Sequence, residues 1–222
     1  MYISYLFTCF FEHVNYVAIS ECNTHDTVTV HLFLRKFLAY VKEKLPHIKH
    51  IAYFSDGCAG QYKNCKNFLN LCHHQADFGF SAEWHFFSTS HGKGPCDGLG
   101  GTIKRLATKA SLQRCTEGMH SEQILSPTAF FEFCCQNIKN IEFVFTTYND
   151  YDEESNLLSS RHSEAITIAG TQQFHFFSPV SLNEVCVKPY TDSPISVVKK
   201  VAHASQSLSS DDQLKTMLLL II

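Results

Sequence analysis

The sequence has little net charge, no long apolar run and no paired cysteine motif. Its formal net charge is −3 over 222 residues, so any contact with nucleic acid requires a local basic patch. The apolar run TMLLLII at residues 216–222 is far shorter than the roughly 20 residues of a membrane span. The start, MYISYLFTCFFEH, lacks the basic region and the small-residue cleavage site of a signal peptide. These absences predict an intracellular protein that does not contact a membrane.

The ten cysteines do not follow a metal-binding or disulfide pattern. No C-x-x-C pair occurs, and Cys58, Cys65 and Cys72 are seven residues apart. On a helix this spacing is two turns, or about 10 Å of rise, and thiolates so far apart cannot share one tetrahedral zinc ion. We therefore predict reduced thiols, mostly packed in the core.

The apolar fraction of 45%, with 19 Phe, is sufficient for a folded core. The residue patterns predict a hairpin followed by alternating helices and strands. The predicted segments are a hairpin at 2–11 and 14–20, helices at 26–45, 61–74, 100–112 and 127–137, and strands at 48–55, 82–90 and 141–148. This alternation predicts an α/β domain that contains a parallel element.

The composition changes after residue 148. We predict a core domain at 1–148, an acidic and polar linker at 149–160 (DYDEESNLLSS with Asn149), a short β-rich appendix at 161–191 and a loosely ordered tail at 192–222.

Two carboxylates follow neighbouring predicted strands. Asp56 comes directly after the strand that ends IAYFS, and Asp97 lies where a Gly-rich turn leads into a basic helix. Ligands of open α/β sheets bind outside the carboxyl ends of the strands, and Mg²⁺ accepts a site of one or two carboxylates completed by water and phosphate. Turn chemistry for Asp56 and a helix-capping role for Asp97 are the alternative interpretations.

The turn HGKGPCDGLGG, at residues 91–101, is the most specific local feature. Its glycines allow a close backbone approach to phosphate, and the helix that follows offers an N-terminal anion site. It matches neither a Walker loop nor a dinucleotide-binding turn, so we predict no small-molecule cofactor. The residues that we expect to contact nucleic acid are His91, Lys93, Lys104, Arg105 and Lys109. Each is also compatible with a solvated surface residue.

Residues 51–110 resemble the transposase-like proteins that DNA transposons encode in animal genomes. The matching motifs are 55–57 (SDG), 61–64 (QYKN), 73–74 (HH), 77–78 (DF), 84–87 (WHFF), 90–93 (SHGK), 95–98 (PCDG), 100–101 (GG) and 104–105 (KR). The stretch 20–35, with HDT at 25–27, is similar to the same family, and the resemblance covers most of residues 14–190.

The resemblance implies a ribonuclease-H-like, DDE-type domain with a mixed sheet and flanking helices. In that fold the first three strands are antiparallel, and the fourth and fifth run parallel to the first. Asp56 would be the second catalytic acid and Asp97 is the candidate for the third. With three acids, two Mg²⁺ ions would activate a hydroxyl for attack on a DNA phosphodiester.

The chain departs from this family at its start, since no strand corresponds to the first strand with its acid. That strand is normally central, between the second and the fourth, and its loss would leave backbone groups unpaired. We therefore expect a partial, inactive transposase domain in the nucleus, with DNA as its partner. The alternative is a non-enzymatic module that binds nucleic acid or protein through the basic face at residues 93–114.

Overall fold

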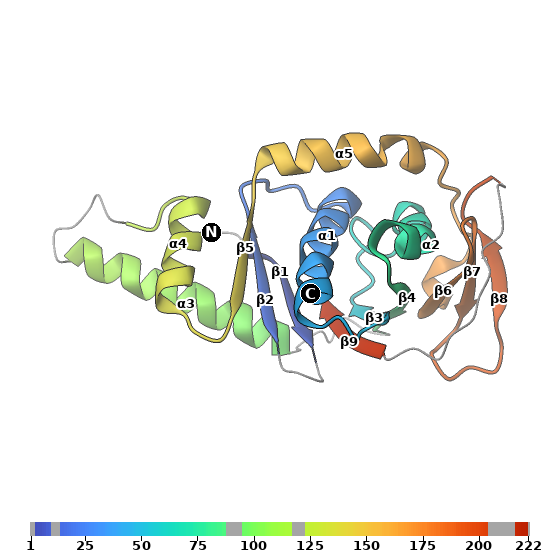
Figure 1. Cartoon of the computed structure of the whole chain (residues 1–222), viewed down its shortest axis with the longest axis horizontal. Coiled ribbons are helices and arrows are strands. Elements are labelled where there is room, and N and C mark those ends of the chain that lie inside the picture. Colours follow the sequence, from blue (N-terminus) through green and yellow to red (C-terminus); the bar gives the residue numbers. More distant parts are fainter. Residues whose placement is uncertain (1–2, 10–13, 88–94, 117–122, 204–215, 222) are drawn as a thin grey trace.

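A single nine-stranded mixed sheet organises the chain, with helices on its two faces (Figure 1). The computed structural model describes residues 3–9, 14–87, 95–116, 123–203 and 216–221. The strands are β1 (Ile3–Cys9), β2 (Asn15–Ser20), β3 (His50–Ser55), β4 (Ser81–Phe86), β5 (Glu142–Thr146), β6 (Phe176–Ser181), β7 (Glu184–Lys188), β8 (Val197–Lys200) and β9 (Thr216–Ile221). The helices are α1 (Thr27–Lys44), α2 (Cys65–Phe78), α3 (Pro95–Thr116), α4 (Pro127–Asn137) and α5 (Tyr148–Ser163), with a 3-10 turn at Thr171–Gln173. The predicted α/β class is confirmed.

The strands follow the order β5-β2-β1-β9-β3-β4-β6-β7-β8. Strand β1 is antiparallel to both of its neighbours, β2 and β9. Strand β9 is parallel to β3, β3 is parallel to β4, and β5 is parallel to β2. The carboxyl ends of β5, β2, β9, β3 and β4 therefore all lie at one end of the sheet.

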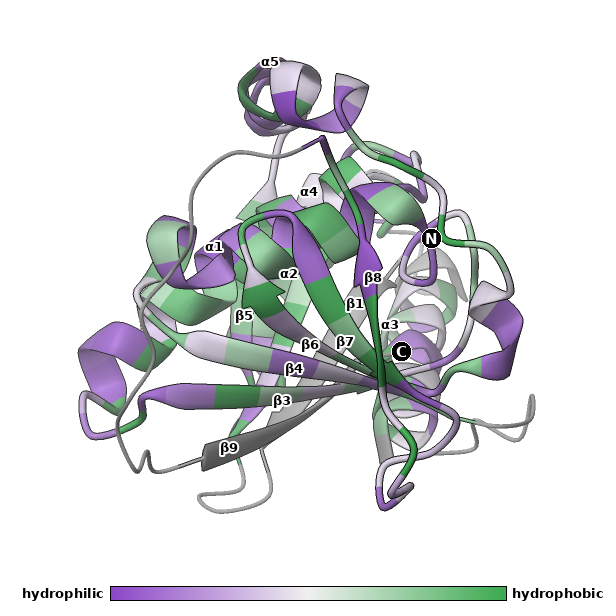
Figure 2. Cartoon of the chain, turned by 90° about the vertical axis from the view of Figure 1, so that its right-hand side faces the viewer, coloured by the Kyte–Doolittle hydropathy of each residue, from purple (hydrophilic) through white to green (hydrophobic). Residues whose placement is uncertain are grey.

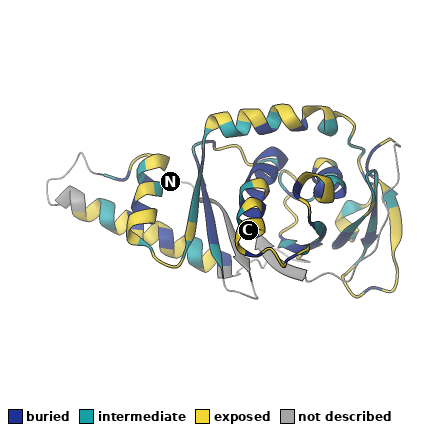
Figure 3. Ribbon diagram, viewed as in Figure 1, coloured by how far each residue is buried: buried dark blue, intermediate teal, exposed yellow. Residues whose placement is uncertain are grey.

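Both faces of the sheet are buried at β2, as the alternation along this strand shows. Tyr16 and Ala18 belong to the core that α1 and α2 cover, whereas Val17 and Ile19 belong to a second core with residues of α3 and α4. A strand that is covered on both faces carries a continuous apolar run, because both of its side-chain rows need apolar surroundings. Figure 3 shows β2 buried and the outer surfaces of the helices exposed.

Local sequence signals account for the helix ends. Asp26 caps α1 by accepting a hydrogen bond from the Thr29 amide at 2.9 Å, and Ser126 caps α4 in the same way through the Ala129 amide at 3.1 Å. Gly79 ends α2 at φ +80, a left-handed conformation that glycine adopts at little cost. Among the described residues, no helix has both the length and the apolar character needed to cross a membrane.

The linker predicted at residues 149–160 is instead most of helix α5, so that prediction is wrong. Thr147 and Asp150 form a capping box, in which the Thr147 amide donates to the Asp150 carboxylate at 2.8 Å. The helix runs across α1 and α2 (Figure 1), and its surface is mainly hydrophilic (Figure 2). The buried residues of α5 are only Glu154 and Leu158, so its sequence lacks the apolar stripe that would have predicted a helix.

The tail predicted at residues 192–222 also differs from the structure, because it contributes β8 and β9 to the sheet. Strand β9 lies between β1 and β3, the central position for which no strand was predicted. The β-rich segment at 161–191 supplies β6 and β7, which continue the same sheet beyond β4 rather than forming a separate appendix. The ring of Phe177 on β6 stacks on Phe68 of α2, with 4.2 Å between ring centroids, and this contact joins the segment to the core.

Candidate functional site

Asp56 lies at the carboxyl end of β3, as the sequence predicts. Its carboxylate accepts a hydrogen bond from the Cys58 amide at 2.9 Å, which is the local turn that Asp-Gly sequences favour. The turn is anchored by Ser55, whose hydroxyl donates to the Asp56 carbonyl at 2.9 Å and accepts from Trp84 Nε1 at 2.8 Å. Trp84 and Ser55 are buried and Asp56 is exposed, so the carboxylate sits at the surface on a rigid base.

Asp97 lies in the first turn of α3, where a negative charge interacts favourably with the helix dipole. The neighbouring Cys96 is buried in the core formed by α3, α4 and the sheet, so the start of α3 is fixed against the sheet. Asp97 itself is exposed. The two predicted carboxylates therefore come from two different elements, and each has a structural role of its own.

The part of the chain that the structure describes contains no group of three or more His, Cys, Asp or Glu side chains arranged to hold a metal ion. Asp56 and Asp97 are the two carboxylates that the sequence proposes for a metal site, and neither belongs to such a group. Strand β9, with the sequence TMLLLI, occupies the central position and contains no carboxylate.

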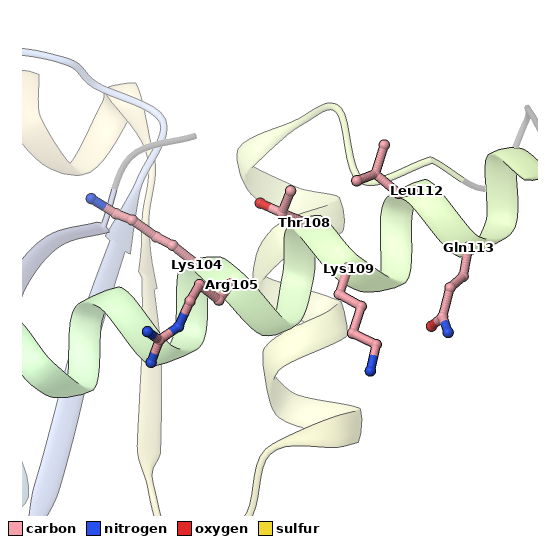
Figure 4. Close-up of a pocket in the computed structure, with 6 residues that line it drawn as sticks. All are labelled: Lys104, Arg105, Thr108, Lys109, Leu112 and Gln113. Atoms are coloured by element: carbon pink, nitrogen blue, oxygen red, sulfur yellow. The ribbon is translucent and has the colours of Figure 1, made fainter.

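The basic residues of α3 form an exposed face. Lys104, Arg105 and Lys109 line an open hollow together with Thr108, Leu112 and Gln113 (Figure 4). The opposite face of the helix carries Ile103 and Ala107, which are fully buried. Arg105 and Lys109 are four positions apart and therefore lie side by side on the helix, whereas Lys104 is exposed on a different side of it.

The electrostatic character of this face is one-sided. Between residues 96 and 113, where the structure describes the side chains of α3, Asp97 is the only acidic residue. Arg105 donates to Thr102 Oγ1 at 3.1 Å, which fixes the guanidinium at the helix surface. His91 and Lys93, the other two predicted nucleic-acid contacts, lie outside the described residues.

A partly buried charge network, which the sequence did not predict, joins α5 to α1 and α2. Glu154 of α5 contacts Nδ1 of His31 on α1, and it accepts from Arg35 Nε at 2.8 Å. The other ring nitrogen of His31, Nε2, lies 3.3 Å from the Asp77 carboxylate of α2. Arg161 of α5 closes the network with two hydrogen bonds to Asp77, at 2.6 and 2.8 Å.

His31 lies between the two carboxylates of the network. Both of its ring nitrogens face carboxylate oxygens. Burial alone raises the pKa of Glu154, but the hydrogen bonds and charges of His31 and Arg35 hold it below its ordinary value. The pKa of Asp77 is likewise lowered, against the effect of burial, by His31 and Arg161. His31, a polar residue on the buried face of α1, was the sequence signal that could have indicated this network.

A second buried polar contact joins β3 to α2. His74 donates from Nδ1 to the Phe80 carbonyl at 2.7 Å, so its Nε2 accepts from the Tyr53 hydroxyl at 2.6 Å. Burial lowers the pKa of His74 to about 4, and the ring is therefore neutral in the folded protein at neutral pH. This histidine belongs to the HH motif of the sequence, and its role is in the core.

The fold and the site define a mixed α/β protein that presents a carboxylate at the end of a central strand and a basic helix beside the sheet. The chain belongs to the family described as a domain of unknown function, DUF8701, whose family model matches residues 2–191. Neither a curated protein nor a solved structure matches the chain.

Proposed function

We propose that this chain is a ribonuclease-H-like domain derived from a DNA transposase, and that it binds DNA through α3 without cleaving it. The observation that carries the proposal is the order β2-β1-β9-β3-β4 within the sheet. Three antiparallel strands, β9, β1 and β2, are followed by β3 and β4, which run parallel to β9. This arrangement supports the fold that the transposase resemblance implies, with β9 in the place of the first strand.

The proposed lack of nuclease activity follows from the carboxylates. In a DDE-type site, Mg²⁺ would be held by Asp56, Asp97 and an acid on the strand that β9 replaces. The sequence of β9 has no acid, and the Asp56 carboxylate is engaged in its own turn. Two metal ions about 4 Å apart need bridging carboxylates to offset their mutual repulsion, so two acids alone give a weak site.

The proposed contact with DNA follows from the exposed face of α3. Lysine and arginine side chains that neutralise phosphates release bound counterions, and this release stabilises the complex at low salt. Lys104 and Lys109 are exposed, and on this part of α3 no carboxylate competes with phosphate for them. The proposed contacts are with the phosphate backbone of DNA, so we expect little preference for any DNA sequence.

Fluorescence anisotropy with a labelled DNA duplex, measured over a range of salt concentrations, tests this binding. The variant Lys104→Ala/Lys109→Ala is expected to bind more weakly and to reduce the slope of log K against log salt by about 2. The matched control is Lys49→Ala/Lys139→Ala, which removes the same charge from exposed positions outside α3. Equal losses in the two variants would show that binding follows net charge rather than the α3 face.

The Asp56→Asn variant separates binding from cleavage. We expect it to bind DNA as the wild-type protein does, in the presence or absence of Mg²⁺, because the α3 face is unchanged. Incubation of supercoiled plasmid with Mg²⁺ provides the second readout. Cleavage by the wild-type chain that disappears in Asp56→Asn would refute the proposed inactivity and would restore the nuclease hypothesis.

A further inference from the structure

Strand β9 is a central strand that comes from the far end of the sequence. Its main chain pairs in parallel with five residues of β3, from His50↔Thr216 to Phe54↔Leu220. On its other side it pairs antiparallel with three residues of β1, from Phe7↔Ile221 to Cys9↔Leu219. A six-residue segment thus joins two strands that do not pair with each other.

The space between β1 and β3 has the width of one strand. Neighbouring strands lie about 4.8 Å apart, so β1 and β3 are separated by roughly twice that distance. Without an inserted strand, the N–H and C=O groups along both edges would lose their partners, which costs free energy wherever water is excluded. The slot therefore binds an extended segment through main-chain hydrogen bonds on two sides, which is the β-augmentation mode of recognition.

The sequence of β9 matches such a slot. TMLLLI contains no charge, no proline and no glycine, and a segment of this composition is prone to pair with other strand edges when it is free. Residues 204–215 separate β9 from the preceding described part of the chain, and twelve extended residues span at most about 43 Å. A connection of that reach allows β9 to enter either its own slot or that of a neighbouring molecule.

We propose that the gap between β1 and β3 is a strand-binding site, and that residues 216–221 of a second copy of this chain can fill it. Exchange of an identical segment preserves every native contact, so the exchanged dimer has nearly the same contact energy as the monomer. The balance between them depends on protein concentration, because insertion within one molecule competes with insertion from another. This proposal does not depend on DNA binding by α3.

The test uses the full-length chain, refolded at increasing protein concentration and analysed by sedimentation. We expect a dimer that grows with concentration during refolding and persists on dilution. A synthetic peptide of residues 211–222, present during refolding, should bind the slot and abolish the dimer. The same peptide with Leu219→Pro is the control, because proline cannot donate to the ladder and should leave the dimer unchanged.

The full-length Leu219→Pro variant gives a second readout. It is expected to bind the wild-type peptide in equimolar amount and to regain thermal stability or, if it is unfolded alone, its circular dichroism signal. A wild-type chain that remains monomeric at every refolding concentration would overturn the proposal. The proposal would also be overturned by a dimer that persists both in the presence of the wild-type peptide and in the full-length Leu219→Pro variant, since another surface would then hold the two copies together.

Discussion

Replacing Glu154 with alanine is expected to destabilise the fold more than any other single change in α5. The carboxylate is 5% exposed and contacts both His31 and Arg35 of α1. Its removal leaves the buried His31 ring with one carboxylate partner in place of two. Because α5 has only Glu154 and Leu158 as buried residues, the substitution removes one of the two groups that fix the middle of this helix.

The expected magnitude follows from the exposure of the partners. Breaking a buried ion pair by removing one member costs about 3–5 kcal/mol, since the remaining charge stays buried. The Arg35 side chain is 43% exposed and can be hydrated again, whereas His31 is 3% exposed and cannot. We therefore expect a loss of about 3 kcal/mol in the free energy of unfolding, at the lower end of that range.

Urea unfolding followed by circular dichroism measures this loss. The matched control is Asp152→Ala, which removes an exposed carboxylate two residues away on the same helix and should change stability by less than about 0.5 kcal/mol. Replacing His31 and Glu154 together with leucine should recover much of the loss, because an apolar pair leaves no buried charge. If Glu154→Ala and Asp152→Ala unfold at the same urea concentration, α5 is not held by this network and the reasoning fails.

The contribution of this network also has a defined pH dependence. The pKa values of Glu154 and Asp77 are lowered in the folded state, so the unfolded chain binds more protons at acidic pH. Their stabilisation is complete above the pKa of an unfolded carboxyl group, about 4, and is lost as the pH falls through the folded values. The difference in the free energy of unfolding between the wild-type chain and Glu154→Ala should therefore become smaller at acidic pH.

Three further predictions concern the elements that support the site. Ser55→Ala should cost about 1–3 kcal/mol in urea unfolding, because it leaves the buried Trp84 N–H without its acceptor. Gly79→Ala should lower the melting temperature, since φ is +80 there, whereas Gly98→Ala, in a helix with open space around it, should raise it by removing a flexible residue. As the pH falls from 6.5 to about 4, protonation of His74 in the unfolded chain should lower the free energy of unfolding by up to about 1.4 kcal/mol per pH unit, and this contribution should be absent in His74→Gln.

The sequence predicts well the elements whose signals are local. Helix α1 begins after Asp26, and α4 spans Pro127–Asn137 as predicted, because a capping side chain and a proline at the first turn define the start of a helix. The prediction that Asp56 follows a strand was also correct, because a short apolar run followed by Asp-Gly is typical of the end of a strand. These features depend on residues within a few positions of one another.

The features that the sequence did not predict depend on distant partners. Helix α5 is held by contacts from Glu154 to His31 and Arg35, which are 123 and 119 residues away. Strand β9 pairs with β1 and β3, and a six-residue apolar run does not reveal on its own which edges it will join. Local sequence patterns could likewise place Asp56 after a strand and Asp97 near the start of a helix, but they did not identify a third carboxylate near these two.

The position of β9 has a consequence for how the chain folds during synthesis. Strands β1 and β3 leave the ribosome early, yet the strand that joins them follows every other described element in the sequence. Contacts between residues so far apart in sequence form slowly, and strand edges promote aggregation as long as they remain unpaired. Until β9 has been translated, the nascent chain carries an incomplete sheet, and we expect its folding yield to depend on chaperones that shield the two open edges.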